Sequence, residues 1–420
     1  MKIKYTLLAL ATPFLMNAQN VMTPETLWTL NKIGVTAVSP EQSALLYSVG
    51  KVDLKTEKTN KKNFFLNVNS GVATALDLGK KSVIQWDKNG MYAKEGDQIF
   101  ISKDSGKTWT LFYAIGDADN IVISPDGKKI AFSKEVLVEK LMGKDKYSDV
   151  PKSSAYIYTD LNHRHWDSSS VDTAKDLLEG KTWDSPQRPF GGAEDFVWSP
   201  DSMELLYVLK PLSGAQYAQS TNTDIFAFNT TNGTTRNLTE SNKGYDTNPK
   251  FSPDGKSLTW LSMERNGYEA DKNDIKMMDW KSGAVTNLTK NWDESITGDV
   301  FFAKDSKTLY FTTAFRGTKQ LFSLNPKTLK IDQLTKGNFD INEIYSQEKN
   351  TLLVSRNDMN HNPDLYAVDV KNGEMKQVTN VNQDNYAKLL PSKTELKMVK
   401  TTDGKEMGVW FVYPPNFDPA

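Results

Sequence analysis

Cysteine is absent from this chain of 420 residues, and histidine is scarce, with three residues in all. The absence of cysteine excludes disulfides, catalytic thiolates, cysteine-ligated metals and lipid attachment through a thiol. An excess of one charge is also missing, because 51 basic residues balance 52 acidic ones. Proteins that bind nucleic acids present a basic face, so we expect no nucleic-acid partner. We also expect no cofactor.

Long apolar runs are missing except near the N-terminus. Lys2 and Lys4 precede an apolar stretch at residues 7–16, which is too short to span a bilayer stably. Ala18 is a small residue near a suitable cleavage point. The pattern predicts a signal peptide at residues 1–19, with a buried N-terminal helix as the alternative. No other stretch is apolar enough to cross a membrane, so we expect no membrane anchor and a periplasmic or secreted protein.

Aromatic residues and one repeated pattern of strands and turns are what the chain has in abundance. Residues 252–255 read Ser-Pro-Asp-Gly, in which proline fixes φ, aspartate caps the local backbone and glycine accepts a positive φ. Sequence typical of strands flanks this turn, and a second hairpin is expected over residues 274–289. The unit predicts about four strands in roughly 40–50 residues, which is the size of one β-propeller blade.

The unit recurs along the chain. Turn-like anchors lie near residues 39, 86, 124, 199, 252, 303 and 346. Later copies also share a third strand that opens with Asp-Ile or Asp-Leu and a fourth strand that ends in threonine. A unit of this size cannot bury its apolar faces alone, so the copies must pack on one another. We therefore predict an all-β fold, a β-propeller of about seven four-stranded blades over residues 24–394, with eight blades as the alternative.

Two segments flank the repeats. Thr23 and Pro24 predict the cap and the first position of a short helix that leads into the first blade. Residues 395–420 depart from the repeat and predict a hairpin that turns at Asp403 and Gly404. A proline-rich stretch follows, and we interpret the segment as the beginning of another domain.

Residues 102–109 read Ser-Lys-Asp-Ser-Gly-Lys-Thr-Trp and look like the Asp-box hairpin of sialidases and other propellers. We interpret the motif as a structural hairpin, in which the carboxylate of Asp104 ties the turn while Trp109 packs inside the blade. A glycosidase function would also need an arginine cluster, and no motif in the sequence specifies one.

The step between the turns at Ser124 and Ser199 is roughly 25–30 residues longer than an average blade. The extra sequence predicts a short helix at residues 135–142. It is either an insertion that carries contacts, a solvated excursion or an irregular extra blade. His163 and His165 would share one face of a strand, but no supporting ligand motif accompanies them. We therefore expect a structural role for both histidines and no metal site.

The repeats resemble the propellers of the prolyl oligopeptidase family and of TolB-type proteins. Residues 163–167 (His-Arg-His-Trp-Asp) and 189–201 are similar to the dipeptidyl-peptidase V branch, which is acylaminoacyl-peptidase-like. Residues 402–419 look like the first strands of that family's α/β-hydrolase domain, where its Ser-Asp-His triad lies, with the serine on a Gly-x-Ser-x-Gly elbow. The sequence contains no such elbow. The resemblance thus implies that residues 395–420 begin a truncated hydrolase domain, and that the chain lacks the triad and is inactive alone.

The resemblance implies the propeller part of an exported serine exopeptidase that releases dipeptides from the N-termini of oligopeptides. Such a propeller admits short peptides, and an acidic side chain holds the substrate α-ammonium group at a fixed distance from the nucleophile. Related dipeptidyl peptidases use adjacent acids of the propeller for this purpose, and Glu194 and Asp195 are the best match here. Arg164 is a further candidate, for a peptide carbonyl or carboxylate. The alternative is that Asp195 caps a turn and Glu194 is solvated.

The expected partners are short peptides and the chain's own C-terminal α/β-hydrolase domain, with a homodimer as one option for the full-length enzyme. A stand-alone TolB-like protein-binding propeller is the alternative function, and a glycosidase is a third. The proline-rich residues 414–419 favour the peptidase, because a free-standing propeller has no need of a strand that leads into a hydrolase domain.

Overall fold

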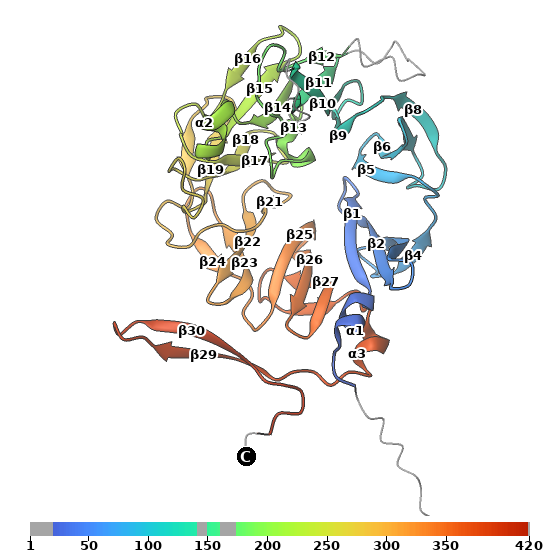
Figure 1. Ribbon diagram of the computed structural model, residues 1–420, viewed down its shortest axis with the longest axis vertical. Helices are drawn as coiled ribbons and strands as arrows, with labels where there is room; N and C mark the ends of the chain where they lie inside the picture. Colours follow the sequence, from blue (N-terminus) through green and yellow to red (C-terminus); the bar gives the residue numbers. More distant parts are fainter. Residues whose placement is uncertain (1–19, 141–148, 160–173, 419–420) are drawn as a thin grey trace, which may run out of the picture.

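A computed structural model describes residues 20–140, 149–159 and 174–418. These residues form seven four-stranded antiparallel sheets, and Figure 1 shows them arranged as a ring. Each sheet is built from consecutive strands, and the first strand of each sheet lies nearest the centre of the ring. The predicted β-propeller is therefore confirmed, and the described strands make seven blades rather than eight.

The strand bounds follow the repeat. The first three blades contain β1 (Lys32–Val38), β2 (Ala44–Asp53), β3 (Lys58–Asn67) and β4 (Ala73–Leu76); β5 (Ser82–Asp87), β6 (Gly90–Glu95), β7 (Gln98–Ser102) and β8 (Thr110–Ala114); and β9 (Asp119–Ile123), β10 (Ile130–Lys140), β11 (Asp149–Tyr158) and β12 (Lys175–Asp176). Blades 4 and 5 contain β13 (Phe196–Trp198), β14 (Glu204–Leu209), β15 (Asp224–Asn229) and β16 (Thr235–Asn237); and β17 (Asp246–Phe251), β18 (Ser257–Ser262), β19 (Asp274–Asp279) and β20 (Val285–Asn287). Blades 6 and 7 contain β21 (Val300–Phe302), β22 (Leu309–Phe315), β23 (Thr318–Leu324) and β24 (Ile331–Gln333); and β25 (Asp340–Glu348), β26 (Thr351–Asp358), β27 (His361–Asp369) and β28 (Met375–Gln377).

The connections of such a blade alternate between two faces of the ring, because neighbouring strands are antiparallel. We call one of them the turn face. It carries the connections from first to second and from third to fourth strand, such as residues 252–256 and 280–284 in blade 5. We call the other the termini face. It carries the connections from second to third strand and from blade to blade, such as residues 210–223 and 238–245, and the chain enters β1 and leaves β28 there.

The Ser-Pro-Asp turns of the turn face hold themselves in shape. In blade 5, the hydroxyl of Ser252 donates to the Asp254 carboxylate at 2.7 Å and accepts the backbone N–H of Ser257 at 3.0 Å. The same carboxylate accepts the N–H of Lys256 at 3.2 Å, which is the local cap that the sequence predicts. Turns at Ser124 and Ser199 repeat the serine–aspartate bond at 2.6 Å.

Serine also links neighbouring turns. Ser202 and Ser306 have positive φ angles of 62° and 59°, where glycine is the usual choice. The hydroxyl of Ser202 accepts the N–H of Asp126 in the preceding blade at 3.0 Å, and Ser306 does the same for Asp254 at 3.1 Å. Each serine thus forms a hydrogen bond between neighbouring blades, which offsets the cost of its strained backbone conformation.

The Asp and Thr of the repeat meet inside blades 5 and 7. In blade 5, the hydroxyl of Thr289 donates to Asp274 at 2.7 Å and accepts the N–H of Ile275 at 3.0 Å. Thr379 and Asp364 form the same bond in blade 7 at 2.6 Å. The motif therefore ties the fourth strand to the start of the third by satisfying buried polar groups.

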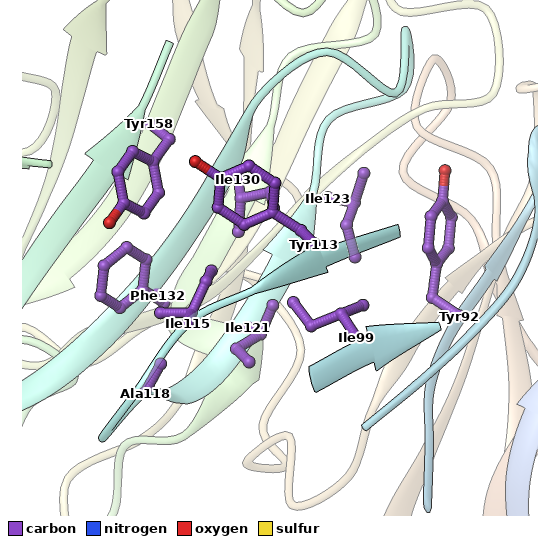
Figure 2. Packing of buried hydrophobic residues seen from close by; sticks show 10 residues of the cluster. All are labelled: Tyr92, Ile99, Tyr113, Ile115, Ala118, Ile121, Ile123, Ile130, Phe132 and Tyr158. Carbon is purple, nitrogen blue, oxygen red and sulfur yellow. The ribbon is translucent and has the colours of Figure 1, made fainter. Parts of the chain in front are cut away.

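Buried aromatic and branched side chains fill the spaces between blades. Figure 2 shows the cluster between blades 2 and 3, in which Phe132 and Tyr158 stack with ring centroids 5.6 Å apart. Tyr113 of blade 2 reaches Tyr158 of blade 3, with centroids 5.4 Å apart. Burial of one such ring stabilises the fold by about 1.5–3 kcal/mol, so the seams between blades contribute much of the stability.

The ring closes between blades 1 and 7 without a blade shared by the two ends of the chain. The N–H of Asn31 donates to the side chain of Asn382, and the Asn382 amide donates to the Asn31 carbonyl, both at 2.8 Å. A buried cluster crosses the same seam and contains Leu45, Tyr47, Leu66, Leu353 and Leu365. Side chains hold this seam in the described residues, together with backbone hydrogen bonds that join Asn20 to Lys388 and Leu390.

The predicted helix at residues 135–142 is wrong. β10 continues through this segment to Lys140, and Glu135 pairs with Ser153 of β11. The sequence Glu-Val-Leu-Val over 135–138 is rich in β-branched residues, which favour a strand once a partner strand is present. Residues 141–142 lie outside the described part of the chain.

The predicted short helix before the first blade and the predicted hairpin after the last blade are both present. Helix α1 (Pro24–Thr29) begins after Thr23, whose side chain accepts the N–H of Thr26 at 3.2 Å. After the last blade and the short helix α3 (Gln383–Tyr386), strands β29 (Thr394–Lys400) and β30 (Glu406–Val412) form a hairpin outside the seven blades (Figure 1). The side chain of Trp410 donates to the carbonyl of Gly317 in blade 6 at 3.0 Å. No helix in the described residues is long and apolar enough to cross a membrane.

Candidate functional site

Glu194 and Asp195 lie in the 3-10 turn η2 (Ala193–Asp195), immediately before β13, on the termini face. The side chain of Asp195 points inward and is 2% exposed. Its carboxylate accepts the backbone N–H of Gln187 at 3.2 Å. Asp195 therefore fastens η2 to the tight turn at residues 187–191, in which the N–H of Gly191 bonds to the carbonyl of Gln187 at 2.7 Å.

Glycine is required at position 191 for this contact. A Cβ atom there would lie 2.2 Å from the Asp195 carboxylate and 2.6 Å from the Gln187 backbone. Both distances are far below any van der Waals contact, so a larger residue would push the two segments apart. The Gly-Gly sequence before Glu194 is thus explained by the close approach of backbone to carboxylate.

Burial raises the pKa of Asp195 to about 8, and the nearby negative charge of Glu194 adds to the rise, while the hydrogen bond from Gln187 opposes it. A carboxyl group with this pKa retains its proton near neutral pH. Asp195 is thus a poor candidate to hold a cation in direct contact at neutral pH. Its position suits a turn cap, which is the alternative that the sequence left open.

Glu194 has the opposite environment. Its side chain is exposed, and it makes no hydrogen bond or ion pair with any other described residue. The two adjacent acids are therefore separated in role, with Asp195 fixing the turn and Glu194 presenting a free carboxylate. Arg164, the third predicted site residue, lies outside the described residues, as do His163 and His165.

An aromatic cavity of about 770 Å³ lies beside this turn, between blades 4 and 5 on the termini face. Four aromatic side chains line it: Phe190, Tyr217, Tyr245 and Tyr268. The Tyr245 hydroxyl lies 2.7 Å from the side-chain amide of Gln187. Burial, together with the charges of Asp195 and Glu194, raises the pKa of Tyr245 to about 12, which places both acids close to the cavity wall.

Two cations also line the aromatic cavity. Arg188 pairs with Glu135 at 2.9 Å and with Asp184 at 3.3 Å. Lys210 is 9% exposed, and its ammonium lies 4.4 Å from the ring of Tyr217. The sequence reasoning missed both residues. One signal was available for Lys210, which is a charged residue directly after the five buried residues 205–209.

A second cavity of about 660 Å³ adjoins the first on the termini face and shares Met263, Glu269 and Ala270 with it. Four acidic residues line it, namely Glu269, Asp271, Asp299 and Glu343, together with Lys319. Several carboxylates here are already engaged, since Asp271 pairs with Arg265 at 2.8 Å and Asp299 with Lys250 at 3.4 Å. Within the described residues, no group of three or more His, Asp or Glu side chains is placed to hold a metal ion.

The Asp-box serves the fold. Asp104 accepts the N–H of Thr108 at 2.8 Å and its hydroxyl at 2.6 Å, and Trp109 packs against the buried cluster around Met91. Hydrogen bonds from Thr108 hold the pKa of Asp104 well below its usual range. The motif lies on the turn face, on the other side of the ring from the cavities.

The chain is a β-propeller, and comparison with known families agrees. It belongs to the TolB beta propeller domain family, whose model matches residues 197–410. It is 34% identical to dipeptidyl-peptidase 5 of Porphyromonas gingivalis, over 96% of this chain and 62% of that protein. It is 31% identical to dipeptidyl-peptidase 5 of Porphyromonas endodontalis, over 95% of this chain and 61% of that protein. The resemblance to the dipeptidyl-peptidase V branch is thereby confirmed.

Solved structures share the fold at low sequence identity. The acylaminoacyl peptidase of Pyrococcus horikoshii superposes with a TM-score of 0.68 at 14% identity, over 93% of this chain and 59% of that one. The β-propeller domain of the trilobed protease from Pyrococcus furiosus gives a TM-score of 0.53 at 14% identity, over 86% of this chain and 99% of that one. The chain spans about three fifths of the length of the two Porphyromonas relatives.

Proposed function

We propose that this chain is the substrate-admitting propeller of an exported serine exopeptidase that releases dipeptides from the N-termini of oligopeptides. The bond-breaking chemistry would be supplied by an α/β-hydrolase domain that begins at residues 395–420. Support comes from the relatives named dipeptidyl-peptidase 5 and from the hairpin of β29 and β30, which follows the last blade.

The observation that carries the proposal is the free carboxylate of Glu194 beside an aromatic cavity on the termini face. An α-ammonium group that enters this region would meet an anion that no other described residue pairs with, and a charge-assisted hydrogen bond would form between the two. Fixing the amine fixes the register of the peptide, so the scissile bond would always lie two residues away. Asp195 would contribute by holding the turn that carries Glu194.

The size and position of the cavity suit short peptides. A volume of about 770 Å³ lies in the range of small-ligand sites, which bind one or a few side chains rather than a folded domain. The chain leaves the propeller on the same face, after blade 7, so a following domain would begin on the face that carries the cavity. Cleavage chemistry and peptide binding would then lie on one side of the ring.

Export is part of the proposal. Residues 1–19 would direct the chain out of the cytoplasm and then be removed, which places the enzyme in the periplasm or outside the cell. Its partners would be short peptides and its own hydrolase domain. Fractionation of the producing cells tests this point, since detection of unprocessed protein in the cytoplasm alone would contradict it.

A stand-alone TolB-like propeller that binds proteins is the second candidate. The observation that favours it is the family match over residues 197–410. It predicts stable complexes with folded proteins and no peptide cleavage by the product of the whole gene. The exposed residues Met398, Met407 and Phe411 of the hairpin would then be contact residues for such a partner.

The test is a kinetic comparison of the complete gene product with its Glu194→Gln variant. Oligopeptides with a free amine should yield dipeptides, detected by mass spectrometry, and the variant should lose at least about tenfold in kcat/KM because one charge-assisted bond is removed. Glu240→Gln is the matched control, since Glu240 is also exposed on the termini face and does not line the cavity. Unchanged kinetics in the Glu194 variant would remove that residue from the site.

A further inference from the structure

Lys210 is a buried cation that no side chain of the described residues pairs with. The residue is 9% exposed, and no described residue forms a hydrogen bond or an ion pair with its ammonium group. Its nearest recorded partner is the ring of Tyr217, with the nitrogen 4.4 Å from the ring centroid. The side chain lines the aromatic cavity and lies near the start of the connection that carries helix α2 (Gly214–Gln219).

Burial of this ammonium group carries an energetic cost. Lysine is rarely buried unless it is paired, because removing an ammonium group from water carries a large penalty. A contact with an aromatic ring offsets only part of that desolvation cost. Burial accordingly lowers the pKa of Lys210, although the negative charge of Glu269 acts in the opposite direction.

The neighbouring charges leave the ammonium of Lys210 available. Arg188 lines the same cavity, but Glu135 and Asp184 already pair with its guanidinium group. Glu269 is exposed and does not reach ion-pair distance from Lys210. The cavity therefore presents one ammonium group that can form a new ion pair with a ligand.

We propose that Lys210 makes the aromatic cavity a carboxylate-binding subsite for peptides. The carboxylate is either the C-terminus of a short peptide or an acidic side chain of a longer one. The inference rests on the proposed function for the class of ligand. The inference adds that the propeller binds both ends of a short peptide. Glu194 would bind the amine and Lys210 the carboxylate, so short chains would be favoured.

The test uses calorimetric titration of the 420-residue chain with tetra-alanine as the free acid and as the C-terminal amide. The acid should bind about tenfold more tightly or better, because a hydrogen bond between charged groups is worth about 1.5–3 kcal/mol. Lys210→Met, which keeps the apolar stem, should abolish the difference. An amidated tetrapeptide with one internal glutamate distinguishes the two sources, since it binds tightly only if a side-chain carboxylate can reach Lys210.

Lys243→Met is the matched control, because Lys243 is exposed on the termini face outside the cavity. It should retain the preference for the acid, and Lys210→Arg should retain it too, which separates loss of charge from misfolding. Equal affinity for acid, amide and glutamate peptide in the parent chain would overturn the inference, and so would a Lys210→Met variant that keeps the preference.

Modification of one end of the peptide at a time distinguishes failure of the proposed function from failure of the carboxylate subsite. If N-acetylation of the peptide leaves its affinity unchanged while amidation weakens it, the amine site at Glu194 is wrong and the carboxylate subsite stands. If acetylation weakens binding and amidation does not, the carboxylate subsite at Lys210 is wrong and the amine site at Glu194 stands. Absence of binding by every peptide overturns both.

Discussion

The two faces of the propeller treat acidic side chains in opposite ways. On the turn face, hydrogen bonds from Thr108, Ser252 and Ser282 lower the pKa values of Asp104, Asp254 and Asp279. On the termini face, burial raises the pKa values of five aspartates, namely Asp184, Asp195, Asp224, Asp246 and Asp364. Asp271 is an exception on that face, because its interactions with Arg265 outweigh its burial.

This difference in pKa shifts indicates a structural role for the aspartates of the turn face and a functional role for the termini face. The lowered pKa values of Asp104, Asp254 and Asp279 follow from hydrogen bonds within their own turns, so these three carboxylates serve the fold. The termini face holds carboxyl groups with raised pKa values, two adjoining cavities and a buried lysine that forms no ion pair with the described part of the chain. Groups with perturbed pKa values next to a cavity are the usual mark of a functional site.

The largest effect is expected inside a blade near the termini face. Thr289→Val keeps the shape of the side chain but removes the hydroxyl that donates to Asp274 and accepts the N–H of Ile275. Two buried polar groups lose a partner, and the free energy of unfolding should fall by about 2–3 kcal/mol. Urea denaturation measures this, with the exposed Thr286→Val as control, for which a change below about 0.5 kcal/mol is expected.

The corresponding change on the turn face should be smaller. Ser252→Ala removes the bonds to Asp254 and to the N–H of Ser257. The carboxylate is exposed and can turn to water, so only the N–H is left unsatisfied, and the expected loss is about 1–2 kcal/mol. A loss equal to that of Thr289→Val in the same urea experiment would remove the distinction between the faces.

The pH dependence should also differ between the faces. The folded-state pKa of Asp195, about 8, lies above the usual value near 3.9, so the native state binds an extra proton between these pH values. Its contribution to stability is therefore full below about pH 4 and is lost as the pH rises toward 8. Asp195→Asn should flatten the decline of the melting temperature between pH 5 and 9.

Asp254→Asn is the turn-face counterpart. The pKa of Asp254 is lowered, so its contribution is full above the unfolded value and is lost only at acid pH. This substitution should leave the slope between pH 5 and 9 unchanged. Identical slopes for the parent and Asp195→Asn would show that Asp195 is ionised throughout.

The smallest effect concerns the link between neighbouring turns. Ser202→Ala removes the bond to Asp126 and retains the positive φ, whereas Ser202→Gly removes the bond and relieves the backbone. The alanine variant should be less stable than the glycine variant by about 1 kcal/mol. Thermal melting of the two variants measures this difference directly, and a more stable alanine variant would contradict it.

The fold could be predicted from the sequence because the turns of the repeat are held by contacts between residues close together in the chain. The turns at Ser124, Ser199 and Ser252 and the cap at Thr23 involve residues a few positions apart, and all are found in the structure. The helix expected at residues 135–142 failed because its partner strand β11 lies across a gap in the repeat pattern. Local propensity did not reveal that pairing.

The candidate site was predictable only in part. The adjacent acids Glu194 and Asp195 could be named from the sequence, but their different exposure depends on the turn at residues 187–191 closing over Asp195. Lys210 and Tyr245 come from different blades, and no local pattern brings them together. The roles of Glu194, Asp195 and Arg164 in substrate binding stay predictions.

The most direct test of the termini face as the peptide-binding face is the affinity of the chain for a tetrapeptide with a free amine compared with its N-acetylated form. The account predicts that acetylation weakens binding about tenfold in the parent chain and in Glu240→Gln, and has no effect in Glu194→Gln, because the ion pair is lost in either case. Equal binding of the two peptides to the parent chain would contradict the account.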